Sequence, residues 1–433
     1  MKIYSYPSKS ADRKLRAIVN RSLSFRKKDI REVTRILEAV RKGGDEALIG
    51  YVRKFDAPKL SIKTIKVTPQ EFTMAKKQVK PGFGKALNRA ANQIEAFHKH
   101  QARKSWITTQ RPGTVLGQLI NPVESVGIYV PGGTGGTTPL VSSLLMGAIP
   151  AKIAGVKRIA ITTPPKKDGT VDPHLLAAAQ KVGTTDIYKA GSAWAIAALT
   201  YGTQTVPSVD VIVGPGNIYV TLAKKIVSGT VGIDMIAGPS EILIIADKDA
   251  DPDYIAADLL SQAEHDAMAS AILVTDSENI ASGVEKAVKI QLKTLSRRET
   301  AEKSLSAYGA IFKVPELDAA FKLANRIAPE HLELHLKEPF DEIGKVRNAG
   351  AVFIGDYTPE PVGDYVAGPN HVLPTAGTAR FASALSVDHF IRKTSIVHYS
   401  REAFKREAKD IIRLAEIEGL DAHANAVRIR MKK

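Results

Sequence analysis

Two pairs of polar side chains are the residues of this chain most suited to chemistry. The first is Glu330 and His331, adjacent within the run APEH. Histidine is the natural base near neutral pH, and the pKa of a partly buried glutamate can rise enough for it to join in proton transfer. We interpret the pair as part of a helix, where adjacent side chains point about 100° apart and can serve two different proton transfers. An ordinary helix start with Glu in its first turn is the alternative.

The second pair is Gln262 and His265, three residues apart near the end of an expected helix that begins at Asp251-Pro252. Asp is a favoured N-cap, and Pro is favoured at the first helical position. Residues at a spacing of three share a helix face, so an amide oxygen and an imidazole could together hold a ligand or a borderline metal such as zinc. The commoner role of such a histidine is to cap the helix end.

Further residues could complete a ligand set of nitrogen and oxygen atoms. Asp364 lies in a stretch rich in Gly and Pro, Glu418 precedes a glycine that ends a helical pattern, and His423 follows in LDAHANAVRIR. A single Asp or His in a loop is usually structural. Taken together, however, Gln262, His265, Asp364 and His423 form the thiolate-free set that a zinc site needs in a chain without cysteine.

His335 lies four residues after His331 and resembles the second member of a metal-binding pair on a helix. Polar and apolar residues alternate in HLELH. We therefore expect His335 at the surface.

Composition limits the kinds of chemistry that this chain can perform. It has 433 residues, 44% hydrophobic and 24% charged, as in soluble globular proteins with two or more domains. With no cysteine there are no disulfides, thiolate metal sites or thiolate nucleophiles. Oxidation of an aldehyde to an acid would therefore have to activate water. No apolar run is long enough for a membrane span, and no signal-peptide pattern opens the chain, so we expect a cytoplasmic protein.

The net charge of +16 raises the question of nucleic-acid binding. Lys and Arg are nevertheless interspersed with Asp and Glu along most expected helices, as in REAFKREAKDIIR. The sequence contains no long basic block and no aromatic RNA-binding motif. A basic, solvated surface is the better explanation.

From Ser125 onward, strand-like runs alternate with helical ones, which predicts parallel βαβ units in a doubly wound sheet. Glycine-rich turns follow the first and last of these runs, at 131–136 and 214–217. Ligands of such sheets bind beyond the carboxyl ends of the strands, although ordinary tight turns would look the same. The later strand-like runs 270–275 and 310–314 suggest that a first domain resumes after an inserted one.

Ten stretches of the chain resemble the histidinol dehydrogenase family. The resemblance extends over nearly the whole chain, and the matching stretches are IYVPGG, AIPAKIAGV, AIAAL, VGPGNIYV, VGIDMIAGPSEIL, SQAEH, APEHLEL, GDY, NHVLPT and GLDAHANAVRIR. The resemblance implies two Rossmann-like α/β domains, incomplete and doubly wound, the second inserted in the first. The expected parts are an N-terminal arm (1–26), a first α/β domain with the metal and catalytic residues (27–125 and 240–385), an inserted NAD-binding domain (126–239) and a helical C-terminal tail (386–433).

The resemblance also implies roles for individual residues. The family's acid–base pair corresponds to Glu330 and His331, and its zinc ligands correspond to Gln262, His265, Asp364 and His423. Its substrate contacts fall on Ser240, Gln262, His265, His331, Asp364, Glu418 and His423. Two of its NAD contacts fall on Tyr129 and Asn217. Because Glu418 and His423 lie in the tail, the family's intertwined homodimer would supply them from the other subunit.

Two departures from the family pattern affect the cofactor side. A third NAD contact, usually Gln, is Trp194 here, and an indole has no amide oxygen to accept a hydrogen bond. The glycine-rich turn PGGTGGTTPLVSSLLM also runs longer than usual. The residues on the substrate side are intact, so we expect the family's reaction.

The expected reaction is the oxidation of L-histidinol through L-histidinaldehyde to L-histidine with two NAD, in a zinc-dependent enzyme without nucleic-acid or membrane partners. A relative that oxidises another amino or hydroxy alcohol is one alternative, which a change at Ser240, Glu418 or His423 would have favoured. A basic nucleic-acid or scaffold protein that kept the fold is the other, and it predicts losses among the metal ligands and the Glu-His pair. The sequence has neither change.

Overall fold

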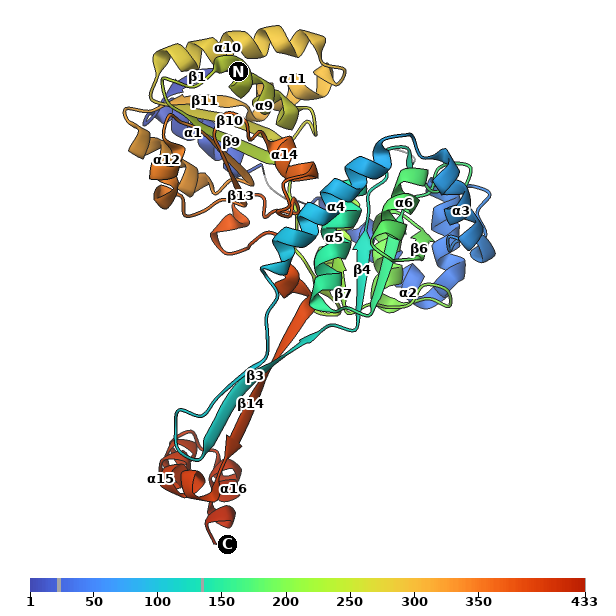
Figure 1. Cartoon of the computed structure of the whole chain (residues 1–433), viewed down its shortest axis with the longest axis vertical. Coiled ribbons are helices and arrows are strands. Elements are labelled where there is room, and N and C mark those ends of the chain that lie inside the picture. Colours follow the sequence, from blue (N-terminus) through green and yellow to red (C-terminus); the bar gives the residue numbers. More distant parts are fainter. Residues whose placement is uncertain (22–24, 134–135, 433) are drawn as a thin grey trace.

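The computed structural model describes residues 1–21, 25–133 and 136–432. Two α/β domains, each built on a parallel sheet, lie side by side, and a long two-stranded ribbon leads from them to a pair of C-terminal helices (Figure 1). The expected α/β class with parallel sheets is therefore confirmed. Among the described residues, no helix is both long enough and apolar enough to cross a membrane.

A six-stranded sheet forms the core of the first domain, and all its neighbouring strands run parallel. Helices cover both faces, because alternate residues of its apolar strands pack to opposite sides. In sheet order the strands are β1 (Ile3–Ser5), β11 (Ala310–Lys313), β10 (Ser270–Thr275), β9 (Glu241–Ala246), β12 (His331–His335) and β13 (Ala351–Ile354). Helices α1 (Lys9–Val19) and α12 (Leu317–Ile327) pack on one face, and α9 (Pro252–Ala263), α10 (Glu278–Gln291) and α11 (Arg298–Tyr308) on the other.

The N-terminal segment is not the separate arm that we expected. Strand β1 pairs with β11 at the edge of the six-stranded sheet, and α1 buries Leu15 and Ile18 against the same domain. The rings of Tyr4 and Tyr6 lie 5.9 and 6.3 Å from that of Phe312. The polar composition of this segment did not indicate that it packs on the sheet, because only one stripe of the short helix α1 is apolar.

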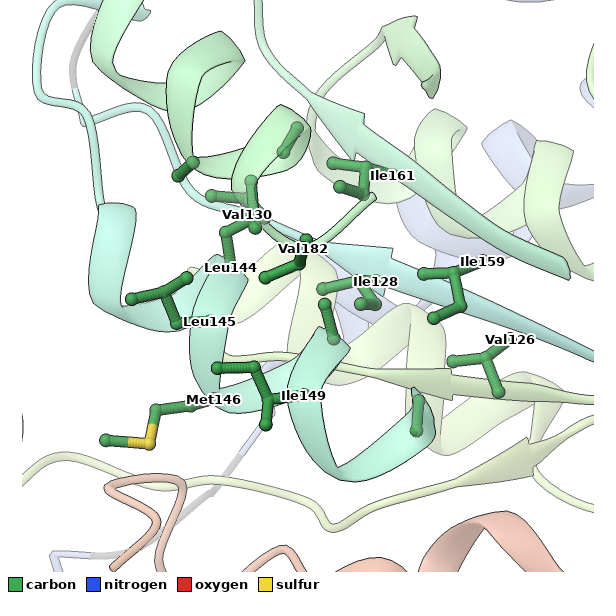
Figure 2. Close-up of a cluster of buried hydrophobic side chains, with 14 of the residues drawn as sticks. Val126, Ile128, Val130, Leu144, Leu145, Met146, Ile149, Ile159, Ile161 and Val182 are labelled. Carbon is green, nitrogen blue, oxygen red and sulfur yellow. The ribbon is translucent and has the colours of Figure 1, made fainter. Parts of the chain in front are cut away.

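A five-stranded parallel sheet forms the core of the second domain. Its strands, in sheet order, are β6 (Asp186–Lys189), β5 (Arg158–Thr163), β4 (Ser125–Tyr129), β7 (Val211–Val213) and β8 (Gly232–Ile233). The helices between them are α5 (Val141–Ala154), α6 (Pro173–Lys181), α7 (Ser192–Tyr201) and α8 (Ile218–Val227). Figure 2 shows Ile128 of β4 and Ile161 of β5 packed with Leu144 and Ile149 of α5 in one apolar cluster.

Three N-terminal helices belong with this second sheet, although we expected them in the first domain. They are α2 (Lys27–Phe55), α3 (Pro69–Gln78) and α4 (Phe83–Lys99). Val33 and Leu48 of α2 share an apolar cluster with Ile196 of α7, and Ile94 of α4 shares one with Leu145 of α5. The pattern of an amphipathic helix shows which face is buried, but not against which sheet.

A long antiparallel ribbon carries the C-terminal helices away from both domains (Figure 1). It consists of β3 (Thr114–Pro122) and β14 (Ile391–Tyr399), with the short β2 (Trp106–Thr108) on β3. Within the expected helical tail, 386–433, the helices are α15 (Arg401–Ile417) and α16 (Asp421–Met431), whereas residues 391–399 form β14 of the ribbon instead of a helix. Large apolar side chains on α15 are exposed, with Leu414 at 62% and Ile417 at 76%. Such a surface on so small a unit is typical of a buried interface.

The remaining helical segments are short. They are η1 (Ile62–Thr64), η3 (Leu292–Thr294), α13 (Pro339–Glu342), η4 (Ile343–Lys345), α14 (Glu360–Tyr365), η5 (Thr378–Arg380) and η6 (Val387–Phe390).

His331 begins strand β12 and Glu330 directly precedes it, so the pair is not on the helix that we expected, and His335 is buried rather than at the surface. The alternation in HLELH is that of a strand, and both faces of this strand lie under helices. Nε2 of His335 lies 3.4 Å from both Asp258 of α9 and Glu333, and its Nδ1 lies 3.5 Å from Asp356. A buried imidazole is thus surrounded by carboxylates.

This cluster predicts a loss of stability in mild alkali. Burial alone lowers the pKa of His335, but hydrogen bonds and charge from Asp258 and Glu333 outweigh it and raise the pKa to about 9. The stabilisation is fully present below the ordinary pKa of 6.5 and is lost as the pH rises through about 9. Burial also raises the pKa of Glu333, to about 7, which acts in the same direction.

We therefore expect the urea midpoint of unfolding to fall between pH 6.5 and 9, and the His335→Gln variant to lose much of this slope. The exposed His398→Gln is the matched control and should retain the wild-type slope. An unchanged slope in His335→Gln would show that other groups cause the pH dependence.

Candidate functional site

The candidate site lies between the two domains, at the amino-terminal strand ends of the six-stranded sheet and the carboxyl-terminal strand ends of the five-stranded sheet. Glu330 and His331 stand at the amino-terminal end of β12, beside Ser240 and Glu241 at the start of β9. The glycine-rich turns follow the carboxyl ends of β4 and β7 in the other domain. One pocket of about 700 Å³ is lined from both domains, including Tyr129, Asn217 and His265.

Glu241 holds both members of the Glu-His pair. Its backbone N–H donates to Oε2 of Glu330 at 2.9 Å, and its own Oε2 accepts the backbone N–H of Glu330 at 3.3 Å. Its carbonyl oxygen lies 2.9 Å from Nδ1 of His331. Residues 241 and 330 are thus locked in a reciprocal pair of hydrogen bonds.

Arg21 neutralises Glu241 in the interior, with its Nη2 2.8 Å from Oε1 of the carboxylate. The guanidinium also donates to the carbonyl oxygens of Ile18 and Met268, at 2.7 and 3.0 Å. Burial raises the pKa of Glu241, and the charge and hydrogen bond of Arg21 oppose that rise. A buried carboxylate needs such a partner.

His331 is held as a neutral base with a defined tautomer. A carbonyl oxygen can only accept, so Nδ1 of His331 carries the proton that it donates to Glu241, and Nε2 keeps its lone pair. Burial lowers the pKa of His331 to about 4. Its Nε2 lies 4.0 Å from Oε1 of Glu360 on α14.

The pKa of Glu330 is shifted in the opposite direction to that of His331. Burial raises its pKa well above 4.5, and the charge of Glu241 adds to this rise. Adjacent residues therefore carry pKa values displaced in opposite directions, as acid–base sites require.

Oxygen and nitrogen donors gather beside the pair. Ligand atoms of His331, Glu360 and Asp364 all lie within 4.8 Å of one another, and Oδ1 of Asp364 lies 3.5 Å from Nδ1 of His371. Burial raises the pKa of Glu360 to about 9, and the charge of Asp364 adds to the rise. Oε1 of Gln262 is buried without a hydrogen-bond partner among the described residues. The chemistry of these donors, an unpaired amide oxygen, an imidazole and carboxylates, fits a divalent metal such as zinc.

The structure brings only some of the expected ligands together within one chain. Gln262 is on α9, His265 follows it and faces the pocket, and Asp364 is on α14. Glu418 and His423 lie on the tail, at the far end of the ribbon (Figure 1), and both are exposed. A complete four-ligand set in this chain would need the tail of another copy.

Four residues of this site were missed in the sequence: Arg21, Glu241, Glu360 and His371. Glu360 has a local signal, because it opens a short helix after Pro359 and stands four residues before Asp364, on the same face. Arg21 and Glu241 have none, since their contact joins segments 220 residues apart.

The expected NAD residues border the same pocket. The hydroxyl of Tyr129 accepts the backbone N–H of Ser192 at 3.1 Å, and Asn217 caps α8 by accepting the N–H groups of Tyr219 and Val220. Trp194 of α7 is buried and lines the pocket. Residues 134 and 135 of the longer glycine-rich turn lie outside the described residues.

The family model described as histidinol dehydrogenase matches residues 20–431. The histidinol dehydrogenase of Desulfotalea psychrophila is 55% identical over 397 residues, which are 92% of each chain. That of Heliobacterium mobile is 50% identical over 433 residues, the full length of both. The crystal structure of histidinol dehydrogenase from Elizabethkingia anophelis has a TM-score of 0.93 at 38% identity and covers 100% of this chain and 98% of its own.

The family match spans both sheets, the pocket between them and the C-terminal tail. This chain belongs to the histidinol dehydrogenase family.

Proposed function

We propose that this chain performs the NAD-linked, four-electron oxidation of L-histidinol through L-histidinaldehyde to L-histidine, the last step of histidine biosynthesis. One observation carries the proposal beyond the family match. It is the neutral His331, whose free Nε2 faces the donor group of Glu360 and Asp364, while its neighbour His265 lines the pocket. A base beside a metal-binding group and a cofactor pocket suits the oxidation of an alcohol. A cytoplasmic location, which we expect from the sequence, remains a prediction.

Gln262, His265 and Asp364 would hold zinc together with His423 of the partner subunit. A bound zinc ion supplies Lewis-acid coordination for the imidazole and amine of the substrate, which fixes their position. The orphaned oxygen of Gln262 is the feature that favours this role. Glu418 of the partner subunit would pair with the substrate ammonium.

In the first oxidation, Nε2 of His331 takes the proton of the alcohol hydroxyl as the carbinol carbon loses hydride. NAD bound in the pocket would accept that hydride, and Tyr129 and Asn217, which line the pocket, would hold this NAD. The products are the aldehyde, one NADH and a proton on His331. The low pKa of His331 lets it release this proton readily.

In the second oxidation, Glu330 takes a proton from a water molecule whose oxygen bonds to the aldehyde carbon. The aldehyde oxygen takes up the proton that His331 gained in the first oxidation, which completes the hydrate. The hydrate would then lose a second hydride to a second bound NAD and a proton to the neutral His331, which leaves the carboxylic acid. A buried carboxylate with a raised pKa is a stronger base once ionised, so Glu330 suits the activation of water. The chain has no cysteine for the thiolate route to an acid.

The tail would reach the site of a second subunit. Its exposed Leu414 and Ile417 lie on α15, and the ribbon holds both helices away from the chain's own domains (Figure 1). A homodimer with two-fold symmetry would bury this apolar surface twice and place Glu418 and His423 reciprocally.

The stoichiometry of NADH tests the reaction. We expect close to two NADH for each limiting L-histidinol, with the activity lost on chelation and restored by zinc. Glu330→Gln should stop after one NADH and leave aldehyde, because water is no longer activated. His331→Asn should lower kcat by about 10²- to 10⁴-fold. The exposed Glu338→Gln serves as the control and should behave as the wild type. Full conversion to histidine by Glu330→Gln would contradict the role of Glu330.

Mixing two inactive variants tests the shared site. His331→Ala and His423→Ala should each be inactive, but their heterodimer contains one site with both residues intact. Random pairing should therefore restore about a quarter of the wild-type activity.

The matched control mixes His331→Ala with Glu330→Ala, two changes in the same half of each site, and should form no histidine, which is the product measured in both mixtures. Two affinity tags verify that mixed dimers have formed. No recovery in verified heterodimers of His331→Ala and His423→Ala would show that each chain completes its own site.

A further inference from the structure

The wall of the pocket formed by α2 and α7 combines stacked aromatic rings with a carboxylate. The ring of Phe55 lies 5.3 Å from that of Trp194 at an interplanar angle of 18°, and the ring of Tyr51 lies 5.7 Å from Trp194 at 9°. Both Phe55 and Trp194 line the pocket, and Phe55 is 53% exposed. A flat aromatic surface open on one side is suited to stacking with a purine ring.

Asp56 follows Phe55 and ends α2, where its backbone N–H donates to the carbonyl oxygen of Val52 at 2.8 Å. Its side chain lines the same pocket, facing Trp194 and Gly191. Oδ2 of Asp56 and Nε1 of Trp194 are both buried, and neither has a hydrogen bond of ideal geometry within the part of the chain that the structure describes. The indole N–H and the backbone N–H of Gly191 face the carboxylate and favour its ionised form. A carboxylate that lines a pocket can accept further hydrogen bonds from a ligand.

Burial raises the pKa of Asp56 to about 6, and the facing groups of Trp194 and Gly191 limit that rise. The carboxylate is therefore ionised at neutral pH and can only accept hydrogen bonds. Glu32 of α2 lines the same pocket and adds a second acidic side chain. Donors such as hydroxyl groups suit this wall, whereas a phosphate would meet like charge.

The two walls of the pocket imply a direction for a bound dinucleotide. His265 and Asp266 come from the six-stranded domain and lie on the side of the substrate residues. The nicotinamide ring must reach the carbon that loses hydride, so it belongs on that side. The adenosine half then lies toward Phe55, Asp56 and Trp194. A carboxylate at that position can bind the ribose hydroxyls, as in other dinucleotide sites.

We propose that Asp56 binds the 2′- and 3′-hydroxyls of the adenosine ribose of NAD, beside the stacking surface of Phe55 and Trp194, and thereby excludes NADP. The inference deepens the proposed function and rests on its NAD linkage. It also gives a role to Trp194, which departs from the family pattern: in place of a hydrogen-bonding amide, the buried indole packs against the exposed ring of Phe55 and supports it as a stacking surface.

Direct binding tests this selectivity without any turnover. The chain has two tryptophans, and Trp106 is exposed on β2, so Trp106→Phe leaves Trp194 as the only indole, inside the pocket. NAD, NADP, ADP-ribose and nicotinamide mononucleotide are titrated against its fluorescence, with calorimetry as a second reading. In this background NAD and ADP-ribose should bind more tightly than NADP.

Adding Asp56→Asn should reduce the ratio of NAD to NADP affinity by about ten- to a hundredfold, the usual effect of one charge-assisted hydrogen bond. The affinity for nicotinamide mononucleotide, which lacks the adenosine, should not change. Asp56→Glu keeps the charge and should still discriminate against NADP. The exposed Asp276→Asn is the matched control and should leave every affinity unchanged.

An unchanged ratio in a folded Asp56→Asn variant would overturn the proposal, as would an equal loss of affinity for nicotinamide mononucleotide and NAD. If neither NAD nor ADP-ribose gave a fluorescence change or heat with the parent protein, the NAD linkage itself would fail, and this inference with it. The first two results leave NAD binding in place, so the two failures are distinguishable.

Discussion

The reciprocal hydrogen bonds between Glu241 and Glu330 are the constraint on which the site depends. They join the starts of β9 and β12, and the same Glu241 fixes the ring of His331 through its carbonyl oxygen. Arg21 pairs with the Glu241 carboxylate and so offsets the free-energy cost of burying its charge. Loss of one member of a buried ion pair typically costs about 3–5 kcal/mol, so the N-terminal segment is part of the site's support.

The position of the site follows from the way the two sheets meet. The acid–base pair lies at the amino edge of one parallel sheet, and the glycine-rich turns lie at the carboxyl edge of the other. The pocket between them is lined by both domains, with His265 from the six-stranded domain and Phe55, Asp56 and Trp194 from the other. A substrate and a dinucleotide can therefore approach the same point from different sides.

How much the sequence could predict depends on the range of each signal. The helix with Gln262 and the parallel sheets followed from local periodicity and caps, and the structure has both. The alternation in HLELH led us to expect His335 at the surface. Buried strands in a covered parallel sheet can nevertheless carry polar residues when these pair, and the sequence does not show that both faces of the strand are covered. Which sheet α2 packs on, and that Arg21 reaches Glu241, depend on contacts between distant segments, which local patterns do not encode.

The residues that line the pocket were easier to predict from the sequence than the residues that hold the site in place. Tyr129, Asn217 and His265 were identified from motifs, and they border one pocket. Glu241 lies inside the same motif as Ser240 but was passed over, because its role runs through its backbone as much as its carboxylate. Backbone contacts place few demands on residue type, so they leave little trace in a sequence.

The protonation state of His331 is the central claim, and nitrogen NMR of the metal-free, ¹⁵N-histidine-labelled protein measures it most directly. His331→Gln assigns the signal. Because burial lowers the pKa of His331 to about 4 and Nδ1 donates to Glu241, the ring should remain neutral, with the proton on Nδ1, between about pH 5 and 8. A ring that becomes charged near its ordinary pKa of 6.5, or one protonated on Nε2, would contradict the account.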